Sequence, residues 1–269
     1  IIGNPNVGKS VLFNSITGAS QGIGNWCGKT TEVCTMAVQY KNRDIHFTDL
    51  PGIYGYGNHS PEEVLVNDFL RENPPDVVMG VVDAMNLERG LYLLLETLER
   101  FSQVMVVLNK MDTAAEQDVV VYHDRLEAEL QIHVSPEIAT GHLNAEELFD
   151  TVLHVADRVL PIRAYAIRYG EKIEQLLKDL PESAGKNLSG SERWEKLKRL
   201  EAENDSLQSE IISKRYNVAE DIATRIAAKR HSGDTISDRI DRWTLHRIWG
   251  IHIMLVAFGF MFYLTFAVS

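Results

Sequence analysis

The chain has 269 residues, of which 45% are hydrophobic and 24% charged, and its formal net charge is −11. This composition excludes a disordered tail and is typical of a globular protein with one or two domains. Residues 1–162 carry 10 basic and 23 acidic side chains, net −13, whereas residues 163–269 carry 17 and 15, net +2. So acidic a first part repels phosphate backbones, which makes nucleic acid a poor candidate partner.

Apolar runs of strand length alternate with helical patterns through the first part of the chain. Strands are expected at residues 1–2, 44–48, 77–82, 104–108 and 131–134. Helices are expected at residues 10–16, 61–70, 91–101, 123–130 and 145–159. This alternation predicts an α/β domain with a mostly parallel sheet covered by helices.

Beyond Pro161 the pattern becomes helical and shows no strand-like runs. Proline ends a helix, so the first domain is expected to cover residues 1–162. Helices are expected at residues 165–180, 191–204 and 206–231. They predict a small all-α domain at residues 163–236.

The last part of the chain, residues 237–269, ends in a long apolar run. From Ile248 to Ser269 there is no Lys, Arg, Asp or Glu, and about 20 apolar residues are enough to cross a bilayer. A buried core helix is the alternative, but such a helix normally keeps a polar stripe. Preceding arginines and Trp243 and Trp249 place everything before about residue 248 in the cytoplasm. Because the chain opens without Met and inside an apolar strand, we expect a fragment that includes the start of a transmembrane helix.

Two cysteines, Cys27 and Cys34, are too few for a disulfide framework and lack the close pairing of a zinc site. The chain is therefore typical of a reducing compartment. For Cys27 an ordinary loop thiol is favoured over a metal or redox sensor.

Residues 3–10, with the sequence GNPNVGKS, match the pattern of a phosphate-binding loop. In such a loop the backbone N–H groups point at the β-phosphate, Lys9 bridges phosphate oxygens, and Ser10 binds Mg²⁺. The residues expected to hold the nucleotide phosphates are Gly3, Asn4, Asn6, Val7, Gly8, Lys9, Ser10 and Val11.

Residues 109–112, with the sequence NKMD, follow an expected strand and indicate which base binds. Asp112 would accept hydrogen bonds from the guanine N1–H and exocyclic amine, whereas adenine offers the wrong donors. Asn109 would contact the base and tie this loop to the phosphate loop, with Lys110 beside it. Alone, the tetrapeptide could also be a strand followed by a helix-capping Asp.

Residues 49–52, with the sequence DLPG, lie between these two motifs. Asp49 would hold Mg²⁺ through water, and the Gly52 N–H would meet the γ-phosphate. In isolation, a simple turn would be the favoured interpretation of this tetrapeptide.

A glycine-rich loop before these residues suits a switch that opens and closes on the nucleotide. Within it Thr30, favoured over Thr31, is expected to reach Mg²⁺ and the γ-phosphate. Lys9, Thr30 and Gly52 are thus the expected catalytic groups. Ile53 stands where many switch GTPases have a water-positioning Gln, which predicts slow intrinsic hydrolysis.

Together these motifs resemble the ferrous iron transport protein B family of bacterial membrane proteins. The resemblance covers nearly the whole chain. It rests on GNPNVGKS, GNWCGKT at 24–30, DLPGIY at 49–54, VVDAMNLERGLYLLLETLE at 81–99, NKMD, Arg215-Tyr216, and the segment 237–251. It implies a Ras-like P-loop GTPase (G) domain, a helical domain that inhibits GDP release, and a membrane domain that moves Fe²⁺.

The resemblance also implies a K⁺ site beside the β- and γ-phosphates. Asn6 would be one ligand, and Gly24 and Trp26 would supply backbone carbonyls from the switch loop. The ion would replace the charge of an arginine finger, which suits the missing Gln. The alternative for Asn6 is a loop residue that satisfies backbone groups.

The family's base-clamping Ser-Ala motif is degraded here, because residues 135–140 read SPEIAT. We expect Ile138 and Ala139 to lie near the guanine. Weak nucleotide affinity and fast GDP release would follow.

The resemblance thus implies a GTP-binding and GTP-hydrolysing region, with Mg²⁺, of a bacterial inner-membrane Fe²⁺ transporter. The expected partners are the protein's own missing membrane domain, small accessory proteins of the iron-uptake system, and a second copy in a homo-oligomer. Two alternatives stay open. One is a nucleotide-sensing gating module with incidental hydrolysis, and the other is a membrane-anchored regulatory or RNA-related GTPase not involved in iron.

Overall fold

The structure is a computed structural model that describes residues 1–18, 24–27, 33–136, 144–158, 166–179 and 190–229, with scattered residues between 252 and 265. The chain divides into two compact units, Ile1–Ala228 and Lys229–Ser269. The predicted boundary near Pro161 and most of the predicted membrane segment, 248–269, lie outside the described residues. Within the described residues, no helix has the length and apolar character needed to span a membrane.

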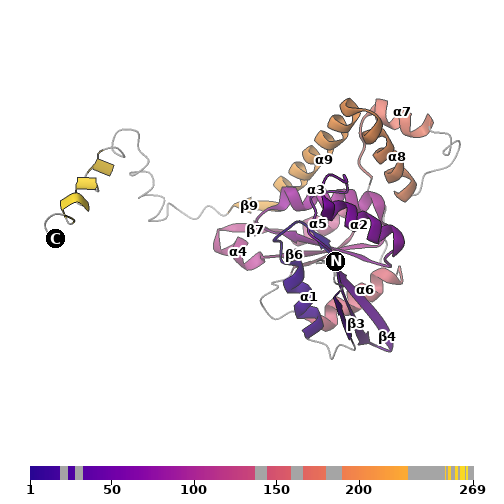
Figure 1. Ribbon diagram of the computed structural model, residues 1–269, viewed down its shortest axis with the longest axis horizontal. Coiled ribbons are helices and arrows are strands. Elements are labelled where there is room, and N and C mark those ends of the chain that lie inside the picture. The colour runs from indigo at the N-terminus through magenta and orange to yellow at the C-terminus, as the bar shows by residue number, and fades with distance from the viewer. Residues whose placement is uncertain are drawn as a thin grey trace. The chain divides into compact units, whose positions relative to one another are not determined.

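A four-stranded sheet forms the centre of the first unit (Figure 1). Its order is β1 (Ile2–Gly3), β5 (Val78–Asp83), β6 (Val104–Asn109) and β8 (His133–Pro136). Every neighbouring pair is parallel, which confirms the predicted parallel sheet. Parallel strands end at the same edge, so residues at the carboxyl ends of β1, β5 and β6 come together there.

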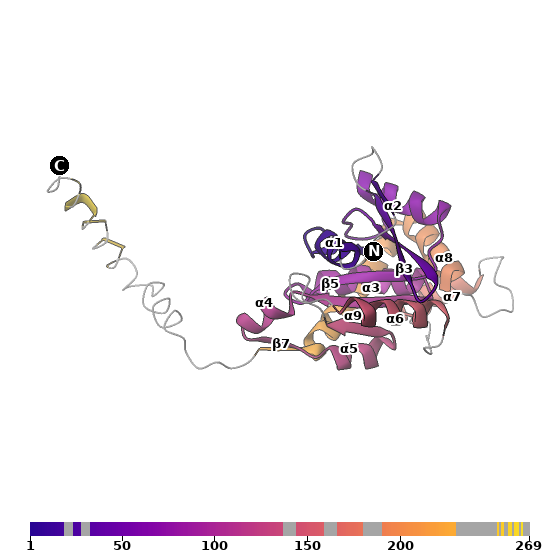
Figure 2. The ribbon, with the colours of Figure 1, turned by 90° about the horizontal axis from the view of Figure 1, so that it is seen from below.

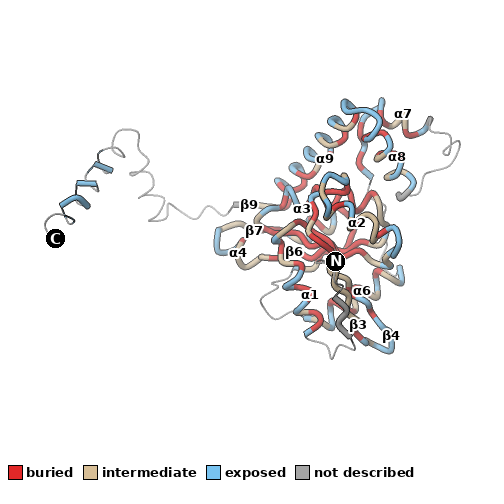
Figure 3. The backbone as a smooth tube through the Cα atoms, in the orientation of Figure 1, coloured by how far each residue is buried: buried red, intermediate tan, exposed pale blue. Residues whose placement is uncertain are grey.

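Two hydrophobic clusters cover the two faces of this sheet. In β6 the side chains alternate, since Val106 and Leu108 join one cluster and Met105 and Val107 join the other. Helices α1 (Lys9–Gly18) and α6 (Ala145–Ala156) pack in the cluster of Met105. Helices α2 (Pro61–Glu72), α3 (Leu87–Arg100) and α5 (His123–Leu130) pack in the other. The central strands are therefore buried on both faces, as their uninterrupted apolar runs predict (Figure 3).

A second, antiparallel sheet consists of β2 (Gly24–Cys27), β3 (Cys34–Tyr40) and β4 (Arg43–Asp49). Only β4 was predicted. Lys41 and Asn42 join β3 to β4 with φ angles of 47° and 59°. A two-residue turn with both residues left-handed is the usual hairpin connection, and asparagine accepts this conformation better than most residues.

Cys34 is disulfide-bonded and lies opposite Cys27 in the ladder between β2 and β3. The sequence has no third cysteine. The interpretation of two cysteines as too few for a disulfide framework did not anticipate this bond. Directly opposed residues of an antiparallel ladder have Cα atoms within the range that a disulfide spans. That proximity depends on the register of β2 against β3, which the sequence pattern did not reveal.

The remaining helices are α4 (Met111–Glu116), α7 (Glu171–Asp179), α8 (Gly190–Glu203) and α9 (Asp205–Ile226). Of these, α4 was not predicted, nor was the short strand β7 (Val119–Val121) that follows it. Helices α8 and α9 pack along α3 (Figures 1 and 2). The helical part of the chain thus covers the face of the sheet that carries α3.

The predicted helix at residues 206–231 ends earlier than expected. Ala227 is extended, with φ −111° and ψ 138°, and begins strand β9 (Ala227–Lys229). This strand pairs with β7, and the Tyr122 N–H donates to the carbonyl of Ile226 at 2.8 Å. The part predicted to be all-α therefore contains a strand, because β7 offers backbone groups that pair with it.

A candidate nucleotide-binding site

The predicted phosphate loop connects β1 to α1 at the carboxyl edge of the parallel sheet. Gly8 has φ +95°, a conformation that favours glycine. A Cβ at this position would lie 2.2 Å from Nδ2 of Asn109. The same Nδ2 donates to the carbonyl of Val7 at 2.8 Å. The predicted tie between the NKMD segment and the phosphate loop is therefore present, and it leaves no room for a side chain at residue 8.

Lys9 begins α1, directly after the loop. It is 7% exposed, and its Nζ donates to the carbonyl of Asn4 at 3.3 Å. Burial lowers the pKa of the Lys9 ammonium, and the nearby Asp49 carboxylate opposes part of that shift. A buried cation beside the amino end of a helix favours a bound anion.

Ser10 and Asp49 lie together at the outer end of the loop. The Ser10 hydroxyl donates to Oδ2 of Asp49 at 2.6 Å. The other carboxylate oxygen, Oδ1, is buried and has no hydrogen-bond partner among the described residues. A hydroxyl and a carboxylate with an unused buried oxygen are the oxygen ligands that Mg²⁺ prefers, so this pair fits the expected ion.

The segment that follows Asp49 packs against the phosphate loop. A Cβ on Gly52 would lie 2.8 Å from backbone atoms of Pro5. The Ile53 N–H donates to the carbonyl of Gly3, and Asn4 Nδ2 donates to the carbonyl of Ile53, both at 3.2 Å. The Ile53 side chain is 1% exposed and belongs to the hydrophobic core. At position 53 only backbone groups therefore contact the phosphate loop, because the side chain lies in the core.

The NKMD segment, residues 109–112, makes a second contact with the loop. Lys110 has a left-handed backbone, with φ 61°, and its Nζ donates to the carbonyl of Asn6 at 3.0 Å. Asp112 lies in the first turn of α4 and is partly exposed. Val11, in contrast, is 45% exposed on the first turn of α1.

Some predicted site residues cannot be placed with the others. Thr30, Ile138 and Ala139 lie outside the described residues. Gly24 and Trp26 belong to β2, where their backbones pair opposite Ala37 and Thr35. The switch threonine, the base clamp and the backbone ligands for K⁺ therefore stay predictions.

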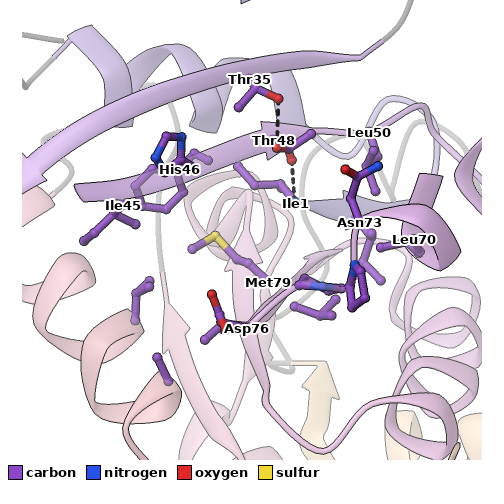
Figure 4. Close-up of a pocket in the computed structure, with 18 of the residues that line it drawn as sticks. Ile1, Thr35, Ile45, His46, Thr48, Leu50, Leu70, Asn73, Asp76 and Met79 are labelled. Atoms are coloured by element: carbon purple, nitrogen blue, oxygen red, sulfur yellow. Dashed lines mark hydrogen bonds between the residues drawn. The ribbon is translucent and has the colours of Figure 1, made fainter. Parts of the chain in front are cut away.

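A separate pocket borders β4 and the beginning of β5 (Figure 4). His46, Asp76 and Met79 line it, and the Thr35 and Thr48 hydroxyls lie 2.9 Å apart at its edge. None of the described residues 3–10 or 109–112 lines this pocket. It is distinct from the phosphate loop.

A buried ionic cluster connects α3 to the helical part; the segments 81–99 and 215–216 that carry the family resemblance contribute to it, but no role was predicted for these residues. Its members are Glu96, Glu99, Lys198, Glu201 and Arg215, which we call the Arg215 cluster. Arg215 is fully buried, and its Nη1 donates to Glu96 at 3.0 Å and to Glu201 at 2.7 Å. Its Nε donates to Glu99 at 3.1 Å. Glu96 and Glu99, three residues apart among the leucines of the second half of α3, are the sequence signal that could have indicated this cluster.

Charges and burial together shift the pKa values of two carboxyl groups in the cluster, those of Glu96 and Glu99. Burial acts to raise the pKa of Glu96, but the charges of Lys198 and Arg215 outweigh it and lower that pKa below its ordinary value. For Glu99, burial wins over Arg215 and raises the pKa. The cluster thus holds Glu96 as a carboxylate.

The Arg215 cluster also reaches the segment that follows Gly52. The Tyr56 N–H donates to Oε2 of Glu96 at 3.0 Å. The Tyr56 ring is 1% exposed, lies 5.0 Å from the Arg100 guanidinium and meets the ring of Trp194 edge-on, with centroids 6.0 Å apart. Burial raises the pKa of Tyr56 to about 12. Residues next to the phosphate loop are therefore anchored directly to α3 and α8.

Known proteins are similar in sequence to this chain over most of its length. A family model described as Ferrous iron transport protein B matches residues 1–152. The Fe(2+) transport protein A/Fe(2+) transporter FeoB fusion protein of Porphyromonas gingivalis is 30% identical over 309 residues, which cover 100% of this chain and 37% of the relative. An Fe(2+) transporter FeoB of Staphylococcus aureus is 27% identical and covers 99% of this chain and 44% of the relative. The chain spans less than half the length of these relatives.

Solved structures agree with this similarity. The cytosolic domain of the T. maritima FeoB iron transporter in a GMPPNP form has a TM-score of 0.72 and 28% identity, over 84% of this chain and 97% of that one. A GDP form of the same domain has a TM-score of 0.73, 28% identity and the same coverage. The cytosolic domain of L. pneumophila FeoB has a TM-score of 0.72 and 30% identity, over 85% of this chain and 98% of that one.

Proposed function

The chain belongs to the ferrous iron transport protein B family, and from this we propose that it binds and hydrolyses GTP to regulate or drive Fe²⁺ uptake by a longer membrane protein. The contact that carries the proposal joins the two nucleotide motifs, where Asn109 donates to Val7 beside Gly8. Relatives solved in GDP and GMPPNP forms support it.

The nucleotide would be held from both ends by groups of this chain. Backbone N–H groups at the start of α1 and the buried Lys9 ammonium would bind the phosphates. Asp112 would accept from the guanine edge, and Asn109 would keep its loop at a fixed distance from the phosphate loop. Because Asp112 would select for guanine, GTP rather than ATP would be the substrate.

Ser10 and Asp49 would hold Mg²⁺, with Thr30 joining them from the switch loop. When bound, the ion would neutralise charge that develops on the phosphates during transfer. The Gly52 N–H would meet the γ-phosphate, since Gly52 lies against Pro5 of the loop. With Ile53 in the core, no side chain from that position would orient the attacking water, so intrinsic hydrolysis would be slow.

Asn6 fits a K⁺ ligand, since it is exposed while its backbone carbonyl is held by Lys110. Carbonyls of Gly24 and Trp26 would complete the site. GTP turnover should then be faster in KCl than in NaCl at equal ionic strength. Equal rates would remove the role of Asn6.

The helical region would sense the nucleotide through the Arg215 cluster. We take residues 1–162 as the G domain, 163–236 as the helical domain, and 237–269 as the start of the membrane part. Movement of the segment after Gly52 would displace the Tyr56 N–H that donates to Glu96. Because Glu96 also binds Arg215, this displacement would change the contacts that Arg215 makes between α3, α8 and α9.

The protein would lie at the bacterial inner membrane with its G domain and helical domain in the cytoplasm. Its own membrane domain would be its partner, and a homo-oligomer and small accessory proteins remain partners to test.

The decisive experiment compares uptake and nucleotide binding in the full-length protein. Asp49→Ala should abolish Fe²⁺ uptake while labelled GTP still binds, because Asp49 would help to hold Mg²⁺ and would not contact the base. Asp68→Ala is the matched control, since that carboxylate forms an exposed pair with Arg71. If uptake survives in a variant that binds GTP without hydrolysing it, the chain is a nucleotide-sensing gating module instead.

A further inference from the structure

We propose that Asp83 is a positioning residue of the nucleotide site, acting through Lys110 on the backbone of Asn6. The inference rests on the proposed binding of guanine nucleotides. No sequence motif singles out Asp83 as a functional residue, and it would not touch the nucleotide itself.

Asp83 is the last residue of β5, and its Cα lies opposite that of Asn109 in β6. The residue is 4% exposed. Its two carboxylate oxygens have different partners. Oδ1 accepts from the Met85 N–H at 2.9 Å, and Oδ2 accepts from Lys110 Nζ at 2.7 Å and from Asn86 Nδ2 at 3.4 Å. One oxygen thus closes the turn that leads into α3, and the other binds the NKMD segment.

The Lys110 ammonium connects this carboxylate to the phosphate loop. Besides Asp83, it donates to the carbonyl of Asn6 at 3.0 Å. An ammonium has three donors on a long flexible stem, so a single neutral carbonyl would hold it weakly. The charged and nearly buried Oδ2 of Asp83 supplies the stronger attachment. Asp83 therefore determines where the ammonium that binds Asn6 lies.

The backbone of Asn6 gains from such support. Its φ of 64° is in the left-handed region, which asparagine adopts more readily than most residues but less readily than glycine, so the hydrogen bond from Lys110 to its carbonyl helps to hold it there. Lys110, which donates to it, is also left-handed, with φ 61°. Because Asn6 lies in the middle of the phosphate loop, the conformation of this residue sets the direction of the loop's N–H groups. Asp83 therefore positions Lys110, Lys110 holds the backbone of Asn6, and that backbone orients the N–H groups that would bind the phosphates.

The chemistry of asparagine separates this role from the turn that Asp83 also closes. Asp83→Asn keeps an oxygen that accepts from the Met85 N–H but removes the charge that holds Lys110. We expect the affinity of the full 269-residue chain for fluorescent GDP to fall about tenfold, the usual scale for losing one charged hydrogen bond. Asp83→Glu retains the charge and should recover part of the affinity. Asn86→Ala is the matched control, because it removes only the 3.4 Å partner of the same oxygen, and it should bind GDP as the unsubstituted chain does.

A double-substitution cycle tests the order of effect. Glycine adopts positive φ freely, so Asn6→Gly removes the need for support at that backbone. In that background Asp83→Asn should cost clearly less than tenfold in GDP affinity. Affinity is measured only on protein that circular dichroism shows to be folded. A general loss of stability would lower the thermal midpoint of the variants, but the losses of GDP affinity from the two substitutions would then be additive.

Three results would overturn the inference: unchanged GDP affinity in Asp83→Asn, an equal loss in Asn86→Ala, or fully additive effects in the cycle. If Asp83→Asn fails to fold, the cycle is run with Asp83→Glu, and additive losses there would overturn it equally. Absence of GDP binding by the unsubstituted chain would instead contradict the proposed function. The two failures are therefore distinguishable.

Discussion

At the scale of single residues, the site depends on a few positions where only one kind of side chain fits. Gly8 faces Asn109 so closely that a Cβ would overlap Nδ2. Ser10 and Asp49 leave one buried carboxylate oxygen without a partner among the described residues. These positions were all predicted from the motifs, because each motif specifies its residues one by one. Asp83 and Tyr56 were missed, because their roles depend on contacts that no motif encodes.

The base contact can be tested by changing one atom. Asp112→Asn replaces an acceptor by a donor and should lower the affinity for GDP by at least tenfold while raising that for xanthosine diphosphate. Competition against fluorescent GDP measures both. Asp124→Asn is the control, because the Asp124 side chain is 91% exposed. Unchanged preference for guanine would refute the contact.

At the scale of elements, the Arg215 cluster joins α3 to α8 and α9 with charges removed from water. Removing one partner of a buried ion pair leaves the others uncompensated. Arg215→Ala should therefore lower the free energy of unfolding by about 3–5 kcal/mol. Lys214→Ala, at the exposed neighbouring position, should change it by less than about 0.5 kcal/mol. Urea unfolding monitored by circular dichroism measures both, and similar values would contradict the role of the cluster.

The same cluster predicts how stability depends on pH. The pKa of Glu96 is lower in the folded chain than its ordinary value, so the unfolded chain binds this proton more readily. The stabilisation by Glu96 is then present above its ordinary pKa and is lost as the pH falls through its folded pKa. Glu96→Gln should be less stable at pH 7, and its unfolding free energy should fall less steeply as the solution is made more acidic than about pH 4.5. An unchanged slope in urea titrations over that range would contradict this assignment.

Secondary structure was predictable where a single hydrophobic pattern, either a continuous apolar run or a helical period, dominated a segment. The buried strands β5 and β6 read as apolar runs, and α5 has the predicted bounds. The hairpin partner β3 and the short elements α4, β7 and β9 were not predicted. The three strands depend on pairing with a neighbour rather than on their own periodicity, as the early end of α9 at Ile226 shows, and α4 is too short for a helical period to be recognised. The disulfide of Cys34 depends on the register of β2 against β3, where Cys34 lies opposite Cys27.

At the scale of the whole molecule, the acidic charge of the chain lies in the part that contains the phosphate loop. Anions are attracted there only locally, by Lys9 and the start of α1. The nucleotide site and the helical region belong to one compact unit, Ile1–Ala228, and are joined by the contact between Tyr56 and Glu96. Under the proposed function, a change at the nucleotide that moves the segment around Tyr56 would reach α8 and α9 through the hydrogen bonds of Glu96 and Arg215.

Calorimetric titration of the full chain with GDP and with ADP, both in the presence of Mg²⁺, tests the central claim most directly. We predict that GDP binds with a stoichiometry of one and that ADP binds at least a hundredfold more weakly. Gly8→Ala should lose GDP binding through its clash with Asn109, whereas Gly18→Ala, where a Cβ meets nothing within 4 Å, should keep it. Equal affinity for ADP, or full GDP affinity in Gly8→Ala, would contradict the account.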